Sequence, residues 1–387
     1  MRRMWLGWLI LLGSMTAAAQ SIDDLNIQIH GFGTQGFLYT TNNNIFTATS
    51  SSGSPAWTEA VVNLTAQPVP KLRFAVQARY FLLGSFGNSI ILDWAAADYK
   101  VNERFGVRFG KVKTPWGLFN EIQDIDPAYM WTLLPQGIYE LDDRESYMTH
   151  YGGVVYGTIG AGKAGKLEYR AWAGEGYYSF SNGAFIDQAE TGYNLPRNIQ
   201  GPLYGGALHW KTPVTGLMVG ASDLTDNTWT APITYQNGST FVTGTHTTVA
   251  NSQPNYFAIY EKGKWLAAFE YERAWVHVTS VFPTLPSGFF LTRQDDRTEY
   301  GMISYKITPK LTAGVYDSQD TNRAAPLGPG RYSKDWAISG RYDFNSFLYA
   351  KAEEHFIEGT NLGYDLTLNS NLKPNTNLTA LKIGVTF

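Results

Sequence analysis

Seven carboxylates gather in one 35-residue stretch of the sequence, between positions 114 and 148. They are Glu121, Asp124, Asp126, Glu140, Asp142, Asp143 and Glu145, and Arg144 alone opposes them, so the net charge of the stretch is −6. Closely spaced carboxylates can perform general acid–base catalysis when a dry pocket shifts the pKa of one of them. A segment this polar is more simply hydrated, and no G-x-S-x-G turn occurs in the sequence. We therefore predict no catalytic residue.

Two glycine-rich motifs resemble nucleotide-binding loops but lack the surroundings that this chemistry needs. Residues 31–36 (GFGTQG) fit G-x-G-x-x-G, yet they lie within an expected strand and open no helix. Residues 160–166 (GAGKAGK) nearly match a phosphate loop, but Leu167 replaces the Ser or Thr that would hold magnesium. The six His are scattered, and the chain has no Cys. We therefore predict neither a cofactor nor a metal site.

The elements that would carry these residues are predicted to be β-strands. The chain has 387 residues and is 44% hydrophobic but only 16% charged, against roughly 25% charged in soluble domains. Its mean hydropathy of −0.22 argues against a helical membrane protein. Apolar and polar residues alternate with period two, most clearly where Leu381, Ile383, Val385 and Phe387 share one face. This pattern predicts an all-β protein.

We expect about sixteen strands, joined alternately by tight turns and long polar loops. The strands begin near residues 27, 57, 72, 90, 105, 149, 167, 203, 216, 255, 265, 297, 310, 333, 347 and 376. Ambiguous alternation in 90–100, 255–262 and 297–308 leaves fourteen or eighteen strands open. The long loops cover 41–55, 114–148, 179–200, 226–254, 279–295, 318–331 and 359–375.

The first nineteen residues have the features of a secretory signal peptide. Arg2 and Arg3 precede an apolar run over 4–12, and small residues at 17–19 form a cleavage site before Gln20. A membrane anchor would need about 20 apolar residues, and this run is half as long. Residues 20–387 would then form the mature chain, whose net charge is −5. No global basic surface recruits nucleic acid, so we expect no nucleic-acid partner.

Period-two alternation fits both a soluble β-sandwich, with its apolar face inward, and a transmembrane β-barrel, with that face toward lipid. Three features favour an antiparallel transmembrane barrel: long strands, the alternation of turns and loops, and aromatic residues at strand ends. Those aromatic residues are Tyr80, Trp94, Tyr99, Trp210, Trp265, Trp275, Tyr305 and Tyr342. The terminal Phe387 resembles the C-terminal signature of bacterial outer-membrane barrels, which the barrel-assembly machinery reads. We therefore expect the bacterial outer membrane, with its lipid and lipopolysaccharide as partners.

Residues 114–148 would then form the third extracellular loop, folded into the barrel. The loop carries many apolar residues, and burying them against the wall lowers the free energy. Its carboxylates Glu121, Asp124, Asp126, Glu140, Asp142 and Asp143 would face lumenal Arg73, Arg79, Arg108 and Arg170 across a constriction. The alternative is that these Arg pair with wall carboxylates in a wet lumen. Lys111 and Lys113 are out of phase with Arg108 and would line the pore only if Gly110 hosted a bulge.

Residues 110–118 (GKVKTPWGL) carry a family resemblance. They are similar to the G-K-x-K-x-P-x-G-L stretch of the phosphate-selective porin O and P family. The resemblance covers the signal peptide, the strand number, the inserted third loop and the terminal Phe. It implies an outer-membrane porin that assembles as a homotrimer. The acidic loop and the mature charge depart from the phosphate-selective pattern, so no phosphate preference is carried over.

The sequence thus predicts a passive channel for ions and small hydrophilic solutes, constricted by residues 114–148. Trp116, Tyr129, Trp131 and Tyr139 leave open a variant in which sugars stack along the loop. The alternative function is an outer-membrane barrel enzyme or adhesin whose activity lies in the extracellular loops.

Overall fold

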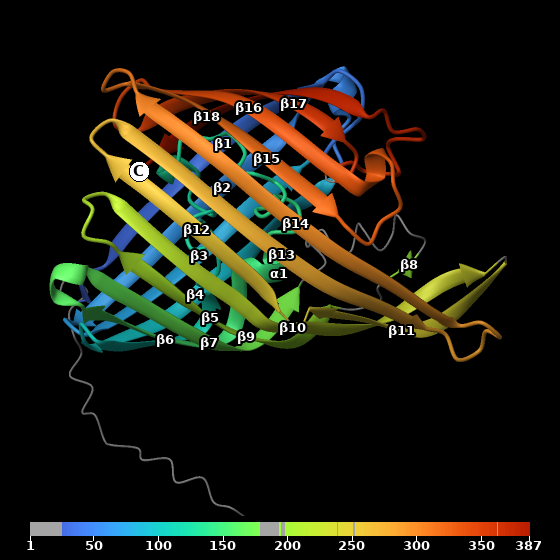
Figure 1. The fold of residues 1–387 in the computed structure, drawn as a ribbon, viewed down its shortest axis with the longest axis horizontal. Helices are drawn as coiled ribbons and strands as arrows, with labels where there is room; N and C mark the ends of the chain where they lie inside the picture. The colour runs from blue at the N-terminus through green and yellow to red at the C-terminus, as the bar shows by residue number, and fades with distance from the viewer. Residues whose placement is uncertain (1–24, 179–192, 195–197, 238, 251, 362) are drawn as a thin grey trace, which may run out of the picture.

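The computed structural model describes residues 25–178, 193–194, 198–237, 239–250, 252–361 and 363–387, and it consists almost entirely of antiparallel strands (Figure 1). The strands are β1 (Gln28–Thr40), β2 (Ser54–Val69), β3 (Leu72–Leu83), β4 (Phe86–Asn102), β5 (Phe105–Lys113), β6 (Thr149–Gly160), β7 (Lys166–Tyr178), β8 (Tyr193–Asn194), β9 (Ile199–Lys211), β10 (Leu217–Asn237), β11 (Thr240–Ala250), β12 (Gln253–Lys262), β13 (Trp265–Val281), β14 (Phe289–Lys306), β15 (Leu311–Asn322), β16 (Tyr332–Asp343), β17 (Leu348–Gly359) and β18 (Asn375–Thr386). The expected signal peptide, 1–19, lies outside the described residues.

These strands close into one barrel with sixteen wall positions. β1 pairs with β2 on one side and with β18 on the other, from Phe32↔Thr386 to Thr40↔Leu378. β11 and β12 share a single position, because both lie between β10 and β13. In the described registers, the two-residue β8 pairs with β10 near its loop end, at Thr234 and Tyr235. The predicted all-β barrel and its strand number are confirmed.

The two ends of the barrel differ. Tight turns join β2 to β3, β4 to β5, β6 to β7, β9 to β10, β12 to β13, β14 to β15 and β16 to β17 at what we call the turn end. The chain also terminates there, at the left of Figure 1. Most of the long connections lie at the opposite, loop end, where β10, β11, β13 and β14 project furthest.

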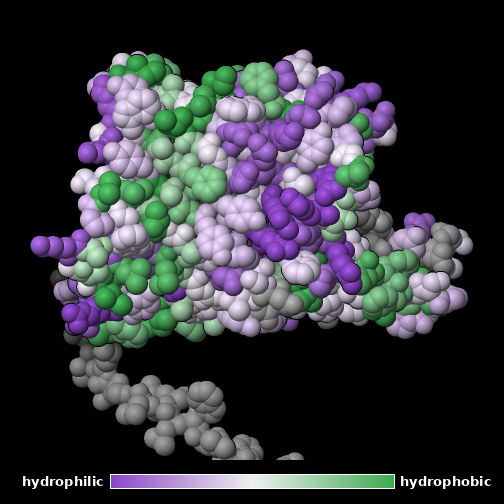
Figure 2. All heavy atoms as spheres, in the orientation of Figure 1, coloured by the Kyte–Doolittle hydropathy of each residue, from purple (hydrophilic) through white to green (hydrophobic). Residues whose placement is uncertain are grey.

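Side chains alternate between the outer surface and the lumen, as the period-two pattern predicts. In β18, Leu381, Ile383 and Val385 are 43–50% exposed on the outside, whereas Ala380 and Lys382 are buried on the inside. Figure 2 shows hydrophobic residues gathered toward the turn end of the visible face and hydrophilic ones toward the loop end. An outward apolar belt of this kind is typical of barrels whose wall contacts lipid.

Two local expectations are wrong. Residues 226–254 are not an irregular loop, because most of them form the hairpin of β10 and β11. These strands are rich in Thr, which favours strands without producing apolar alternation. Trp94 does not belong to the outer aromatic belt either, because the β3–β4 register skips Asp93 and turns both Asp93 and Trp94 inward.

No helix in the described part of the chain is long and apolar enough to cross a membrane. The connection from β5 to β6 runs over 114–148, as predicted, and contains the short helices η3 (Asp126–Ala128) and α1 (Glu145–Met148). We call it the lumenal loop, because its residues contact wall strands on several sides of the barrel interior.

Candidate functional site

The lumenal loop has its own apolar core, and this core explains why the loop folds inward. Trp116, Trp131, Ile138 and Tyr139 are buried, each at most 2% exposed. Trp131 meets Tyr316 of β15 edge to face, with ring centroids 5.2 Å apart. Removing such rings from water stabilises the folded loop. Because Trp116, Trp131 and Tyr139 are used in packing, they leave no open face along which a sugar could stack.

Glu121 is the loop carboxylate that meets two of the predicted arginines. Its oxygens lie 3.2 Å from Arg108 of β5 and 3.4 Å from Arg170 of β7. Arg108 also pairs with Asp98 of β4 at 3.2 Å. The side chains of Glu121, Arg108 and Arg170 are 21–32% exposed, so this charge cluster stays accessible to water.

Asp124 is fully buried in a polar pocket of the wall. It receives Lys113 at 2.7 Å, Gln77 at 2.7 Å and the indole N–H of Trp94 at 3.2 Å. The β4–β5 register runs unbroken through Gly110, so the bulge expected to be necessary for an inward Lys113 is not there. Lys113 nevertheless reaches Asp124 from the end of β5, where β5 is still paired with β6 (Lys113↔Thr149) but the described pairing with β4 has stopped at Ala95↔Lys111.

Asp126 forms the most enclosed ion pairs of the loop. Its carboxylate lies 3.0 Å from Lys351 of β17 and 2.6 Å from Lys382 of β18, and it accepts the Tyr349 hydroxyl at 2.6 Å. Burial alone would raise the pKa of Asp126, but the two ammonium groups outweigh burial and hold the pKa below its ordinary value. The ionised carboxylate therefore fixes the loop to the last two strands.

The other two predicted arginines do not meet the loop carboxylates. Arg79 is buried, pairs with Glu59 of β2 at 2.5 Å and lies over the Phe81 ring. This matches the alternative of pairing with a wall carboxylate. Arg73 is exposed near the turn end of β3, opposite Asp98 in the register. In the described part of the chain, neither forms an ion pair with the loop.

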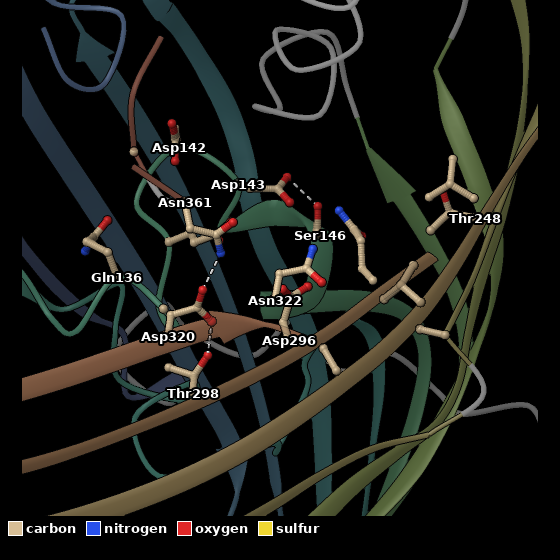
Figure 3. Close-up of a pocket in the computed structure, with 18 of the residues that line it drawn as sticks. Gln136, Asp142, Asp143, Ser146, Thr248, Asp296, Thr298, Asp320, Asn322 and Asn361 are labelled. Carbon is tan, nitrogen blue, oxygen red and sulfur yellow. Dashed lines mark hydrogen bonds between the residues drawn. The ribbon is translucent and has the colours of Figure 1, made fainter. Parts of the chain in front are cut away.

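Glu140, Asp142 and Asp143 line a cavity of about 670 Å³ on the loop-end side of the lumenal loop (Figure 3). Asp142 and Asp143 lie across this cavity from Asp296 and Asp320 of the wall. Burial raises the pKa of Asp142, and the nearby Asp365 raises it further. None of the described residues that line the cavity is Lys or Arg.

Several anchors of the loop were not predicted from the sequence. Glu270 of β13 accepts the Leu118 N–H at 2.8 Å and the hydroxyls of Tyr139 and Tyr300. Glu353 of β17 accepts two further loop amides, at 3.1 and 2.9 Å. Period-two alternation places positions 270, 351 and 353 on inward faces of their strands. Charged residues at these inward positions are the sequence signal that could have identified the anchors.

Arg144, the one cation of the loop, pairs with Asp93 of β4 at 2.6 Å. Burial would lower the pKa of Arg144, but Asp93 together with Glu59, Asp124 and Glu145 outweighs burial and raises the pKa above its ordinary value. This pairing directs the only loop cation toward the β4 wall and away from the cavity lining. The net negative charge of the cavity is therefore not neutralised from within the loop.

The other sequence motifs occupy structural positions. Residues 31–36 lie in β1, and residues 160–166 surround the tight turn η4 (Gly162–Ala164) at the turn end. Within the described ranges, no three His, Asp or Glu side chains are grouped closely enough to hold a metal ion.

The comparisons with known proteins support the fold. No protein-family model matches the chain, and no curated protein matches it in sequence. Among solved structures, the trimer form of OmpT, an outer-membrane protein of Vibrio cholerae, is 13% identical, with 93% of this chain and 99% of that one covered and a TM-score of 0.54. The outer-membrane channel DcaP of Acinetobacter baumannii is 11% identical, with 95% and 99% covered and a TM-score of 0.52.

The anion-selective porin from Comamonas acidovorans is 9% identical, with 93% and 99% covered and a TM-score of 0.52. At these identities the likeness establishes the fold, a closed antiparallel barrel like that of outer-membrane porins. The finer resemblance to the phosphate-selective porin O and P family stays a prediction.

Proposed function

We propose that the chain is a porin of the bacterial outer membrane, through which ions and small hydrophilic solutes diffuse passively. The observation that carries this proposal is the lumenal loop, which crosses the barrel interior and is attached by charged side chains to strands on several sides. An enclosed barrel whose interior is lined by charge provides a polar path through an apolar belt. The structural likeness to a channel and a porin supports the same conclusion.

The loop end would face the outside of the cell and the turn end the periplasm, as in other bacterial barrels. Two accessible groups of charge would define the constriction. Glu140, Asp142 and Asp143 border the 670 Å³ cavity on the loop-end side of the lumenal loop, which we call the outer cavity. Glu121, Arg108 and Arg170 supply both signs of charge elsewhere in the lumen. Asp124, Asp126 and Arg79 would act structurally, because they are buried in ion pairs.

The test is single-channel recording of the purified protein in planar bilayers. Discrete, ohmic conductance steps in salt solution would support a passive channel. Their absence, with the heat-modifiable gel shift of a folded barrel still present, would contradict the proposal. Activity at the loops of an otherwise closed barrel would then favour the enzyme or adhesin.

A cysteine scan tests whether the cavity belongs to the conduction path. The chain has no Cys, so Asp142→Cys would provide a single reactive thiol. Coupling a bulky, positively charged thiol reagent to it should reduce the single-channel current, because the label narrows the path and replaces a negative charge.

The matched control is Glu358→Cys, a carboxylate position on the outer face of β17 near the loop end. Labelling this thiol should leave the current unchanged. Equal effects at both positions, or no effect at 142, would contradict the assignment of the cavity to the path.

The partners in this proposal follow from the same fold. A homotrimer in outer-membrane lipid and lipopolysaccharide is supported by a shallow apolar groove of about 290 Å³ on the outer wall of β2–β4, lined by Leu64, Phe74, Val76, Ala95 and Ala97 among others. Cross-linking of the protein in mild detergent should give a species of three chains. Val76→Arg should reduce that species, and a wild-type monomer would contradict the trimer.

Phe387, exposed beside β18, would be presented to the barrel-assembly machinery.

A further inference from the structure

Three wall carboxylates form a patch on the inner face of β13, β14 and β15, beside the outer cavity. The carboxylates are Glu272, Asp296 and Asp320. Glu272 is aligned with Thr298, and Thr298 with Asp320, so the side chains of Glu272, Thr298 and Asp320 form one row across the strands. Asp296 lies two residues from Thr298 along β14, between Ala274 and Asn322. All three carboxylates line the cavity.

Glu272 has no partner for its charge among the described residues. The residue is only 6% exposed, yet no side chain or backbone group of the described chain forms a hydrogen bond or ion pair with its carboxylate. The side chain of Asp296 also accepts no hydrogen bond from the described chain. Asp320 accepts the Thr298 hydroxyl at 2.6 Å and the Asn361 amide, as Figure 3 shows. Two neutral donors do not balance its charge.

The buried cations of the lumenal loop, β17 and β18 are paired with other carboxylates, and Arg273 and Arg297 of β13 and β14 pair with Asp295. Arg144 pairs with Asp93, and Lys351 and Lys382 pair with Asp126. Asp142 and Asp143 face the wall patch from the loop, so charge of the same sign borders the cavity on two sides. A concave site of one charge sign with low-dielectric walls concentrates counter-ions from solution.

The spread of these charges indicates the class of ligand. No three carboxylates within the described chain converge as a metal site would require. The cavity volume falls in the range of about 300–1,000 Å³ that small-molecule sites occupy. Trp229 and Phe290 also line it, and aromatic rings attract organic cations through their faces.

We propose that this cavity binds organic cations that carry two or more separated positive charges, and that it makes the pore prefer cations over anions. This inference rests on the proposed porin function. A diammonium solute would place one charge near Glu272 and Asp296 and another toward Asp142 and Asp143. A dianion of the same length would meet repulsion at both positions.

The test uses the complete protein in planar bilayers, with 1,6-diaminohexane, n-hexylamine and adipate added on the loop side. In a KCl gradient the wild-type reversal potential should indicate a preference for K⁺. The diamine should block the current at lower concentration than the monoamine, and adipate should not block. E272Q/D296N should raise the half-blocking concentration of the diamine by about tenfold or more and shift the reversal potential toward zero.

The double variant keeps side-chain size and removes two like charges, so the barrel fold should persist. E299Q/E358Q provides the matched control, because these carboxylates lie on outward positions of β14 and β17; wild-type block and selectivity are expected. If E272Q/D296N does not fold, as judged by the gel shift, Asp142→Asn tests the same site from the loop.

The outcomes separate the two proposals. Absence of conductance contradicts the porin function itself. A conducting wild type without cation preference, without diamine block, or with block unchanged in the charge-removing variant overturns the cation site and leaves the porin function standing.

Discussion

Replacing Asp126 by Ala should weaken the attachment of the lumenal loop by about 3–5 kcal/mol, the cost of leaving buried charges without a counter-charge. Lys351 and Lys382 are 0% and 4% exposed and both contact Asp126, so the variant leaves two ammonium groups stranded. Hydrogen–deuterium exchange should detect the change at the loop amides of Thr132 and Leu133. Their exchange should accelerate by about 100-fold or more, since each 1.4 kcal/mol corresponds to a factor of ten.

Glu103→Gln is the matched control for this experiment. It removes one carboxylate from the Lys100–Glu103 pair in the β4–β5 turn, where the side chains are 49% and 81% exposed. Pairs this exposed contribute about 0–1 kcal/mol, so the loop amides should exchange as in the wild type. Unchanged exchange in Asp126→Ala would show that the lysines do not hold the loop.

Deleting residues 121–143 should increase the single-channel conductance severalfold. The shortened loop can reconnect at its base, because the Asn120 side chain donates to the Tyr147 carbonyl at 3.0 Å. The deletion exposes Arg108, Arg170 and Lys351 to lumenal water, where they are hydrated and no longer need protein partners. The β1–β18 pairing that closes the barrel involves none of the deleted residues, so the wall should persist.

Removal of 232–245 from the β10–β11 hairpin is the control for a deletion as such. This hairpin projects from the loop end (Figure 1) and lies away from the loop anchors. Its loss should leave the conductance near the wild-type value. A loop deletion that folds but conducts no better than the wild type would contradict the role of 114–148 as the constriction.

The wall of this protein is predictable from its sequence because its signal is local and repeated. Most strands alternate apolar and polar residues, and each turn is marked by Gly, Pro, Asn or Lys within a few positions. The strands of the β10–β11 hairpin are not predicted by this alternation, because they are rich in Thr and lie beyond the apolar belt, where neither face needs to be hydrophobic. The inward direction of Trp94 is not predicted either, because one inserted residue, Asp93, changes which face the following side chains occupy.

The pairing inside the lumen is much less predictable. The phase of Arg108 and Arg170 indicates an inward direction, but which carboxylate they meet, Glu121, depends on the path of a 35-residue loop. Lys382 lies far along the chain from Asp126, and only closure of the barrel brings the two together. The charge distribution of the cavity likewise depends on Glu272 and Asp296. Each is a single carboxylate within a strand, and nothing in the neighbouring sequence distinguishes it from other inward polar residues.

Closure of the barrel through β1 and β18 has a consequence for biogenesis. These strands are the first and last of the wall, so neither has its full set of partners until nearly the whole chain has been made. Loop-closure entropy opposes such end-to-end pairing, which makes it slow. Until it forms, two unpaired edges remain open to pairing with other chains. The chain is therefore most prone to aggregation just before the last step of assembly, when β1 and β18 have not yet paired.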